Sequence, residues 1–148
     1  MKLVDLNVLL YAVNEDAAHH ATVRGWWEDA LNNDEPLGLP WIVLLGFLRL
    51  ATNASIFPRP LAPEAALARI DTWLGLENTQ VIREADGHWD ILRPLLVQAG
   101  TAGNLVTDAH LAALAIGHGA VLVSCDADFA RFAGLRWENP LERQRPER

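Results

Sequence analysis

The sequence predicts an α/β fold with a mainly parallel central sheet of about four or five short strands and helices on both faces. Strand-like apolar runs occur at residues 2–5 (KLVD), 79–83 (TQVIR) and 120–124 (AVLVS). Segments with helical spacing of apolar residues separate these runs. Alternating strands and helices are typical of βαβ units, whose strands run parallel.

The remaining elements follow the same alternation. We expect helices at residues 19–33, 41–51, 63–76, 88–100 and 107–119. Further apolar or extended pieces lie at residues 8–13 (VLLYAV), 36–40 (PLGLP) and 135–139 (LRWEN). Pro63 and Glu64 suit the first turn of their helix. Gly100 suits a helix end, as does Gly117 or Gly119.

Length and composition predict one domain at residues 1–140, followed by a charged tail at residues 141–148. The chain has 148 residues, of which 51% are hydrophobic and 21% charged, a composition able to bury a sizeable core. No apolar run reaches the roughly 18 to 20 residues of a membrane span, and the N-terminus lacks the features of a signal peptide. We therefore expect a cytoplasmic protein. Its single cysteine, Cys125, excludes an internal disulfide framework.

The formal net charge of -7 argues against unaided binding of nucleic acid. Affinity for phosphates comes largely from Lys and Arg, which displace counterions, and Lys2 is the only lysine. A nuclease stays possible, because a cleft of carboxylates that holds metal ions is itself acidic.

Three aspartates stand where such chemistry is expected. Asp5 ends the first strand, and Asp126 comes shortly after residues 120–124. In open α/β sheets, ligands bind beyond the carboxyl ends of the strands. Asp108 follows Thr107, which we expect to cap the helix and place Asp108 in its first turn, and Asp128 follows Asp126 by two residues. Each aspartate taken alone also suits a turn or an N-cap.

Together the aspartates favour a metal site. Two carboxylates about 4 Å apart repel each other by roughly 4 kcal/mol at an effective dielectric constant near 20. Asp5 precedes an apolar run and should lie near the core, where an unpaired charge is costly. Magnesium or manganese suits such a cluster, because these ions take carboxylate oxygens and water as ligands.

Several segments resemble PIN-domain proteins, specifically the VapC-like toxin ribonucleases of bacterial type II toxin-antitoxin systems. The segments are LVDLNVLLYAV, FLRLATN and GNLVTDAHLAALAIGHGAVLVSCDADFARFAGLRWENP. The resemblance runs from Lys2 to about Pro140 and is most specific in the last third. It implies a PIN-like three-layer fold, in which a few acidic residues converge at the end of the parallel sheet.

Residue by residue, the resemblance assigns the site. The first family aspartate matches Asp5, the helical one matches Asp108, and that of the SxDxDF segment matches Asp126, with Asp128 beside it. It implies that Asp5, Asp108 and Asp126 are catalytic and that all four aspartates bind Mg²⁺, or Mn²⁺ in its place. Asn7 occupies a small polar position two residues after the first acid and could support a metal-bound water.

The resemblance also implies an activity and its partners. The expected activity is Mg²⁺-dependent endoribonuclease cleavage of RNA phosphodiester bonds by metal-assisted hydrolysis. The expected partners are the RNA substrate, a cognate antitoxin protein that neutralises the toxin, and a second copy of the chain in a homodimer. We expect no membrane partner.

Gly46 departs from the family pattern. The family commonly has a glutamate in the helix after the second strand, and this position aligns with Gly46, three residues before Arg49. No Asp or Glu occurs at residues 37–63, and glycine inside a helix costs about 1 kcal/mol relative to alanine. Three interpretations stay open: a toxin branch that works without this acid, a weakened or inactive member, and a change that disables a toxic protein.

Other features favour ordinary structural roles. Trp26 and Trp27 suit packing, with an antitoxin interface as the alternative, and Cys125 suits a small core residue rather than a nucleophile. Two histidines, His110 and His118, are eight residues apart, which is not a chelating spacing. Arg49 is the basic residue that we associate most with RNA or an acidic partner, with a solvated ion pair as the alternative.

Rival functions fit the residues less well. A phosphohydrolase with an aspartate nucleophile needs a second acid two residues later, where this chain has Asn7. A receiver domain needs a lysine at a late strand end, and Lys2 is in the wrong place. The alternative left open is a catalytically weakened PIN-like module that binds RNA or protein without cutting, which Gly46 favours.

Overall fold

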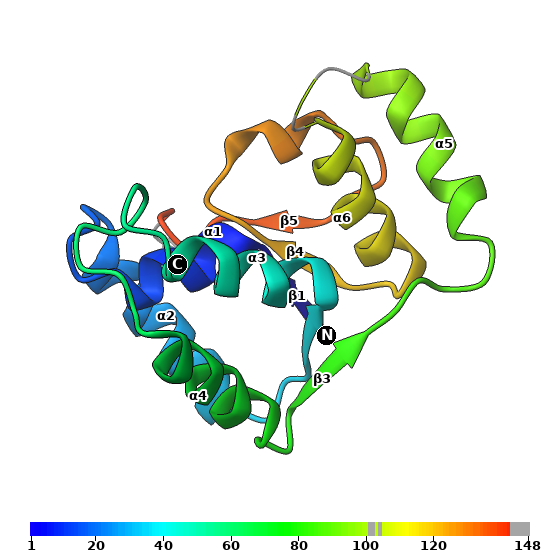
Figure 1. Cartoon of the computed structure of the whole chain (residues 1–148). Helices are drawn as coiled ribbons and strands as arrows, with labels where there is room; N and C mark the ends of the chain where they lie inside the picture. The colour runs from blue at the N-terminus through cyan, green and yellow to red at the C-terminus, as the bar shows by residue number, and fades with distance from the viewer. Residues whose placement is uncertain (101–102, 104, 143–148) are drawn as a thin grey trace, which may run out of the picture.

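A parallel sheet forms the centre of the computed structural model, which describes residues 1–100, 103 and 105–142 (Figure 1). Within these residues the sheet has five strands in the order β3-β2-β1-β4-β5, and all its neighbours pair in parallel. The strands are β1 (Lys2–Val4), β2 (Leu37–Pro40), β3 (Thr79–Ile82), β4 (Val121–Val123) and β5 (Trp137–Glu138). The predicted parallel α/β architecture is confirmed.

Six α-helices and one 3₁₀ helix surround the sheet in the described part of the chain. They are α1 (Leu6–Val13), α2 (His20–Asn32), α3 (Trp41–Ala51), α4 (Pro63–Leu74), α5 (His88–Ala99), α6 (Leu105–Gly117) and η1 (Ala127–Arg131). Helices α1 to α4 pack together beside β1, β2 and β3, while α5 packs on α6, which lies against β4 (Figure 1). None of these helices is long and apolar enough to cross a membrane.

The strand order places a crevice between β1 and β4. After β1 the chain adds β2 and β3 on one side, then crosses to add β4 and β5 on the other side. The loops after β1 and β4 therefore leave the sheet in opposite directions, and the space beyond their carboxyl ends is the expected ligand site. Asp5 follows β1 directly, and Asp126 lies three residues after β4 ends.

Two local expectations are wrong. The first strand ends at Val4, and Asp5 is instead the N-cap of α1, with its carboxylate accepting a hydrogen bond from the Leu6 N–H. The apolar run at residues 8–13 is part of this helix. Helix α6 begins at Leu105, so Thr107 lies inside it and does not cap it. Its apolar periodicity already starts at Leu105, which is one helical turn before the buried Ala109.

Small residues bring α6 close to the sheet. Four alanines of α6 are buried: Ala109, Ala112, Ala113 and Ala115. Short side chains allow a helix axis to approach its neighbour closely, so the first turn of α6 lies near the carboxyl ends of β1 and β4. Gly100, with a φ of 79°, ends α5 as predicted, because glycine adopts positive φ without a steric penalty.

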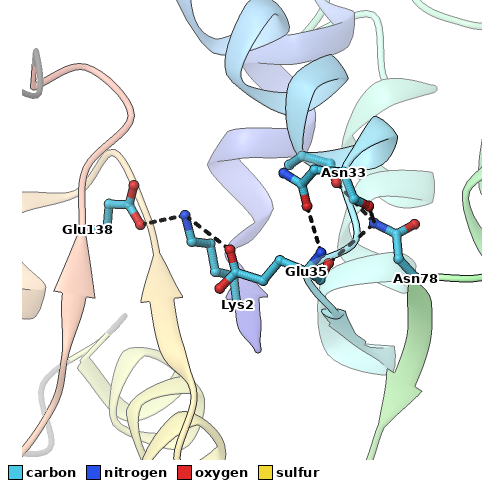
Figure 2. Close-up of polar contacts among 6 residues, drawn as sticks. Lys2, Asn33, Glu35, Asn78 and Glu138 are labelled. Atoms are coloured by element: carbon cyan, nitrogen blue, oxygen red, sulfur yellow. Dashed lines mark hydrogen bonds and ion pairs between the residues drawn. The ribbon is translucent and has the colours of Figure 1, made fainter.

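Lys2 ties strands together and is not a counter-ion of the predicted site. Its ammonium group lies 3.1 Å from the Glu138 carboxylate on β5 and 3.7 Å from that of Glu35, just before β2 (Figure 2). Asn78 donates to the backbone oxygens of Asn33 and Glu35 in the same network. The only lysine is therefore occupied elsewhere.

Candidate active site

A cleft of about 690 Å³ opens beyond the carboxyl ends of β1 and β4. Asp5, Asp108 and Asp126 line it together with residues of α1 and α3. These aspartates come from three separate segments: the N-cap of α1, the first turn of α6 and the N-cap of η1. The fold therefore brings the three predicted catalytic residues to one cavity.

Asp5 is the buried and fixed member of the cluster. Its residue is 8% exposed. Oδ1 accepts a hydrogen bond from the Leu6 N–H at 2.7 Å, and Oδ2 accepts one from the Ser124 hydroxyl at 2.7 Å. Burial raises the pKa of Asp5, the two hydrogen bonds oppose this rise, and the charge of Asp126 adds to it.

Ser124 connects the two strand-end aspartates. Besides donating to Asp5, its hydroxyl oxygen accepts hydrogen bonds from the Asp126 N–H at 3.0 Å and the Asn7 side-chain amide at 3.1 Å. The Asn7 carbonyl oxygen accepts from the Cys125 N–H at 3.1 Å. Asn7 and Ser124 thus hold the loop after β4 against the start of α1.

Asp126 is half-buried and begins η1. Its Oδ1 accepts a hydrogen bond from the Asp128 N–H at 2.9 Å, which leaves Oδ2 available to the cleft. Asp128 is exposed and does not line the cleft. The Asp128 carboxylate instead lies 3.3 Å from the Arg131 guanidinium. Asp128 therefore lies beside the cluster, where its charge acts on Asp108, but it pairs with Arg131 and does not line the cleft.

Asp108 differs from Asp5 in that its carboxylate lies among other negative charges rather than among hydrogen-bond donors. Its pKa is raised to about 6, first by burial and then by the negative charges of Asp5, Asp126 and Asp128, while the positive charge of Arg131 opposes the rise. No hydrogen bond or ion pair to its carboxylate occurs among residues 1–100, 103 and 105–142. A carboxyl group whose pKa is raised by acidic neighbours lacks a compensating positive charge.

The donor set suits a hard divalent cation. Three carboxylates line one cleft without a paired cation in the described chain, and oxygen ligands of this kind are those that Mg²⁺ and Mn²⁺ take. In their present conformations, no three His, Cys, Asp or Glu side chains of the described residues are grouped closely enough to hold one ion. Direct coordination of one ion by all three aspartates therefore requires side-chain rotation, and within the described residues no hydrogen bond restrains the Asp108 carboxylate.

Helix α3 forms the opposite wall of the cleft. Gly46 is buried and lines the same cavity as the three aspartates. A Cβ atom at position 46 would lie 2.7 Å from Cδ2 of Leu6. The Leu6 side chain thus occupies the space in front of Gly46, where any larger residue would place its side chain. The glycine at position 46 and the Leu6 side chain that packs against it therefore belong to one local packing arrangement.

Ser124 and Leu6 are the site residues that the sequence did not reveal. Ser124 follows a buried strand directly, and a polar residue there was a usable signal. Leu6 carried no such signal, because it reads as one more apolar residue. For Cys125, burial first and then the Asp5 charge raise the pKa of the thiol to about 11, which disfavours a nucleophilic thiolate. Trp27 is 3% exposed and packs edge-on against Trp73, as expected of a core residue.

Comparison with known proteins agrees with this architecture. The PIN domain family matches residues 2–135. Ribonuclease VapC37 of Mycobacterium tuberculosis is 48% identical over 140 residues, which cover 95% of this chain and 97% of the relative. VapC ribonuclease Mb2897 of Mycobacterium bovis is 43% identical over 144 residues, covering 97% and 98% of the two chains. The chain therefore belongs to the PIN-domain family, alongside these VapC ribonucleases.

Solved structures support the same fold. In the crystal structure of VapBC2 from Rickettsia felis bound to a promoter DNA fragment, one chain superimposes with a TM-score of 0.67 at 22% identity. The match covers 93% of this chain and 97% of that one. The predicted PIN-like fold with helices on both faces of the sheet is confirmed.

Proposed function

We propose that the chain is the toxin of a bacterial toxin-antitoxin pair and acts as a Mg²⁺- or Mn²⁺-dependent endoribonuclease. The observation that carries this proposal is the convergence of Asp5, Asp108 and Asp126 on one cleft, where Asp108 has a pKa raised to about 6. The ribonuclease names of relatives at 43–48% identity support RNA as the substrate.

Three aspartates and one serine have roles in this proposal. Asp5, Asp108 and Asp126 would hold the cation, which, when bound, lowers the pKa of a water and polarises a phosphate. Asp5 provides a fixed position, because the Leu6 N–H and the Ser124 hydroxyl orient its two oxygens. Asp108 provides an adjustable one. Ser124 keeps Asp126 in register with Asp5 through the hydrogen bond from the Asp126 N–H.

The proposed partners follow from the relatives. A structural neighbour from Klebsiella pneumoniae is a toxin-antitoxin complex, so we propose a cognate antitoxin for this chain. We also propose a homodimer and a cytoplasmic location, which the resemblance to VapC-like toxins implies. The alternative, a PIN-like module that binds RNA or protein without cutting, is not favoured by the relatives, which are named ribonucleases. Calorimetry with Mn²⁺ separates the two, because a pure binding module has no reason to take up metal at the aspartates.

Cleavage of labelled RNA by the purified chain tests the function. We expect cleavage in Mg²⁺, none in EDTA, and a loss of at least about 100-fold in Asp5→Asn and Asp108→Asn, beyond the effect of removing a supporting residue. Asp71→Asn is the matched control, since Asp71 is exposed on α4 and lies away from the cleft. Undiminished cleavage in either cleft variant would contradict the assignment.

A further inference from the structure

Arg49 is the one basic side chain among the residues that line the acidic cleft. It lies in the last turn of α3, is exposed, and faces the cavity from the wall opposite the aspartates. Three other arginines of the described chain have carboxylate partners, namely Arg24 with Glu28, Arg59 with Asp16, and Arg131 with Asp128. Within the described residues, no carboxylate lies within ion-pair distance of Arg49. In the same part of the chain, Arg69, Arg83, Arg93 and Arg136 form no ion pair with a carboxylate either, but none of them lines the cleft.

The charges of the cleft are separated rather than neutralised. The positive charge that lowers the pKa of Asp108 comes from Arg131, and Arg49 is not among the charges that shift Asp5 or Asp108. Apolar Leu6 and Leu50 line the same cavity, together with Gly46. The cleft therefore has an acidic end, suited to a cation, and a separate cationic side chain with no internal partner.

The surface next to Arg49 is apolar and open. Ile42 and Leu45 are 41% and 58% exposed and line the cleft. Residues 42, 45 and 49 are spaced by three and four positions, so their side chains share one face of α3. A cation beside an exposed apolar face matches single-stranded RNA, which offers a phosphate and an unstacked base together. In a duplex the bases are stacked inside.

We propose that Arg49 binds a phosphate of single-stranded RNA and positions the strand across the cleft, with the adjoining phosphodiester at the aspartates. This proposal rests on the proposed ribonuclease function and adds the residue that holds the substrate. A guanidinium group suits this task, because its planar set of N–H donors binds phosphate oxygens in pairs. In a chain with a net charge of -7, one unpaired arginine at the site matters for affinity.

Binding of a short labelled single-stranded RNA, measured in Ca²⁺ over a range of salt concentrations, tests the proposal. We expect Arg49→Ala to weaken binding about tenfold, as for loss of a charge-assisted hydrogen bond. The slope of log affinity against log salt should fall by about 0.7, the value for one phosphate contact on a single strand. Arg49→Lys should keep the slope but lose part of the affinity, because lysine retains the charge without the paired donors.

Arg69→Ala is the matched control. Arg69 is exposed on α4, has no ion pair within the described residues, and lies outside the cleft. Its removal changes the net charge by the same amount and should change neither affinity nor slope. In Mg²⁺, Arg49→Ala should raise KM about tenfold and change kcat much less, as loss of uniform binding does. A merely structural role would instead lower the melting temperature.

The outcomes separate this proposal from the function beneath it. If the wild-type chain cuts RNA while Arg49→Ala behaves like Arg69→Ala, the role of Arg49 is overturned and the nuclease stands. If Arg49→Ala binds RNA normally but loses affinity for the antitoxin, Arg49 belongs to the protein interface and the proposal is overturned. If the wild-type chain neither binds nor cuts RNA, both proposals fail.

Discussion

Asp5 and Asp108 line the same cleft but are held in opposite ways. Asp5 is buried and has both carboxylate oxygens occupied by hydrogen bonds from Leu6 and Ser124. Asp108 is half-buried, and its pKa is raised to about 6 by burial and by its acidic neighbours. The strand-end aspartate is therefore positioned before any ion binds, whereas no hydrogen bond within the described residues fixes the helical one.

The difference shows that one metal site can combine a carboxylate fixed by hydrogen bonds with another whose ionised form is stabilised only by the cation. The hydrogen bonds to Asp5 fix its carboxylate and offset part of its desolvation, although burial still raises its pKa. A carboxylate without donors destabilises the fold when it is ionised, and binding of a cation relieves that destabilisation. Perturbing each side separately should therefore give different signatures.

Apart from replacing the aspartates themselves, the largest expected effect comes from removing the Ser124 hydroxyl that supports Asp5. Ser124→Ala deletes the hydroxyl that donates to Asp5 and leaves the donors of Asn7 and Asp126 without their acceptor. We expect RNA cleavage to fall about 10- to 100-fold and the free energy of unfolding to fall by about 1–3 kcal/mol. Cleavage kinetics and urea denaturation measure the two effects. Wild-type cleavage would show that Asp5 needs no such support.

The next largest effect should come from placing a larger residue at position 46 of α3. In Gly46→Glu, the new Cβ meets Leu6 at 2.7 Å, so Leu6 has to move. We expect Gly46→Glu alone to lower the melting temperature, and Leu6→Ala to relieve this loss in the double variant. One added carboxylate is worth about 1 to 4 kcal/mol of attraction to a charge at 4 Å, so the double variant should bind Mn²⁺ at least about fivefold more tightly than Leu6→Ala.

Calorimetry gives the outcome that would count against this geometry. If the double variant binds Mn²⁺ no better than Leu6→Ala, position 46 does not reach the aspartates. The glycine would then serve only close packing of Leu6 against α3.

The pH dependence of metal binding reports on Asp108. Its pKa of about 6 means that the carboxyl group binds a proton below pH 6, and this proton must leave before a cation can bind. We expect Mn²⁺ affinity, measured by calorimetry, to be nearly constant from pH 7 to 8. Below pH 6 it should fall by about tenfold per pH unit for one displaced proton. A constant affinity down to pH 5 would exclude Asp108 as a ligand.

The smallest expected effect is a gain in stability when the charge of Asp108 is removed. A carboxyl group with a raised folded-state pKa lowers stability as pH rises from about 4 to 6, because the native state holds the proton more tightly than the unfolded state. In EDTA at pH 7.5, Asp108→Asn should therefore stabilise the fold, by about 1 kcal/mol after allowance for solvent screening. The gain should vanish at pH 4. Added Mn²⁺ should stabilise the wild-type chain and not this variant.

Local patterns made much of the site predictable. Asp5 and Asp126 follow apolar strand-like runs, and the rule that ligands bind beyond the strands of a parallel sheet placed both correctly. Asp108 was found because an acid near a helix start is visible in sequence. The end of the first strand and the start of α6 were misplaced by one or two residues, because capping depends on backbone geometry that several neighbouring residues can satisfy.

Contacts between distant residues were not predictable. Asp5 and Ser124 are separated by 119 positions, and only the pairing of β1 with β4 brings them together. The same pairing gives Asn7 its contact with the loop after β4. The sequence also could not show that Asp128 pairs with Arg131 and does not line the cleft.

The sequence by itself determined the α/β class, the parallel sheet and the three aspartates at its edge, because apolar periodicity and strand-end position are local properties. Only the tertiary structure decided the rest of the site. Leu6 fills the space in front of Gly46, and Arg49 remains without a carboxylate partner in the described chain. Both depend on how α1, α3 and α6 pack around the sheet, since burial and charge pairing are set by neighbours in space rather than in sequence.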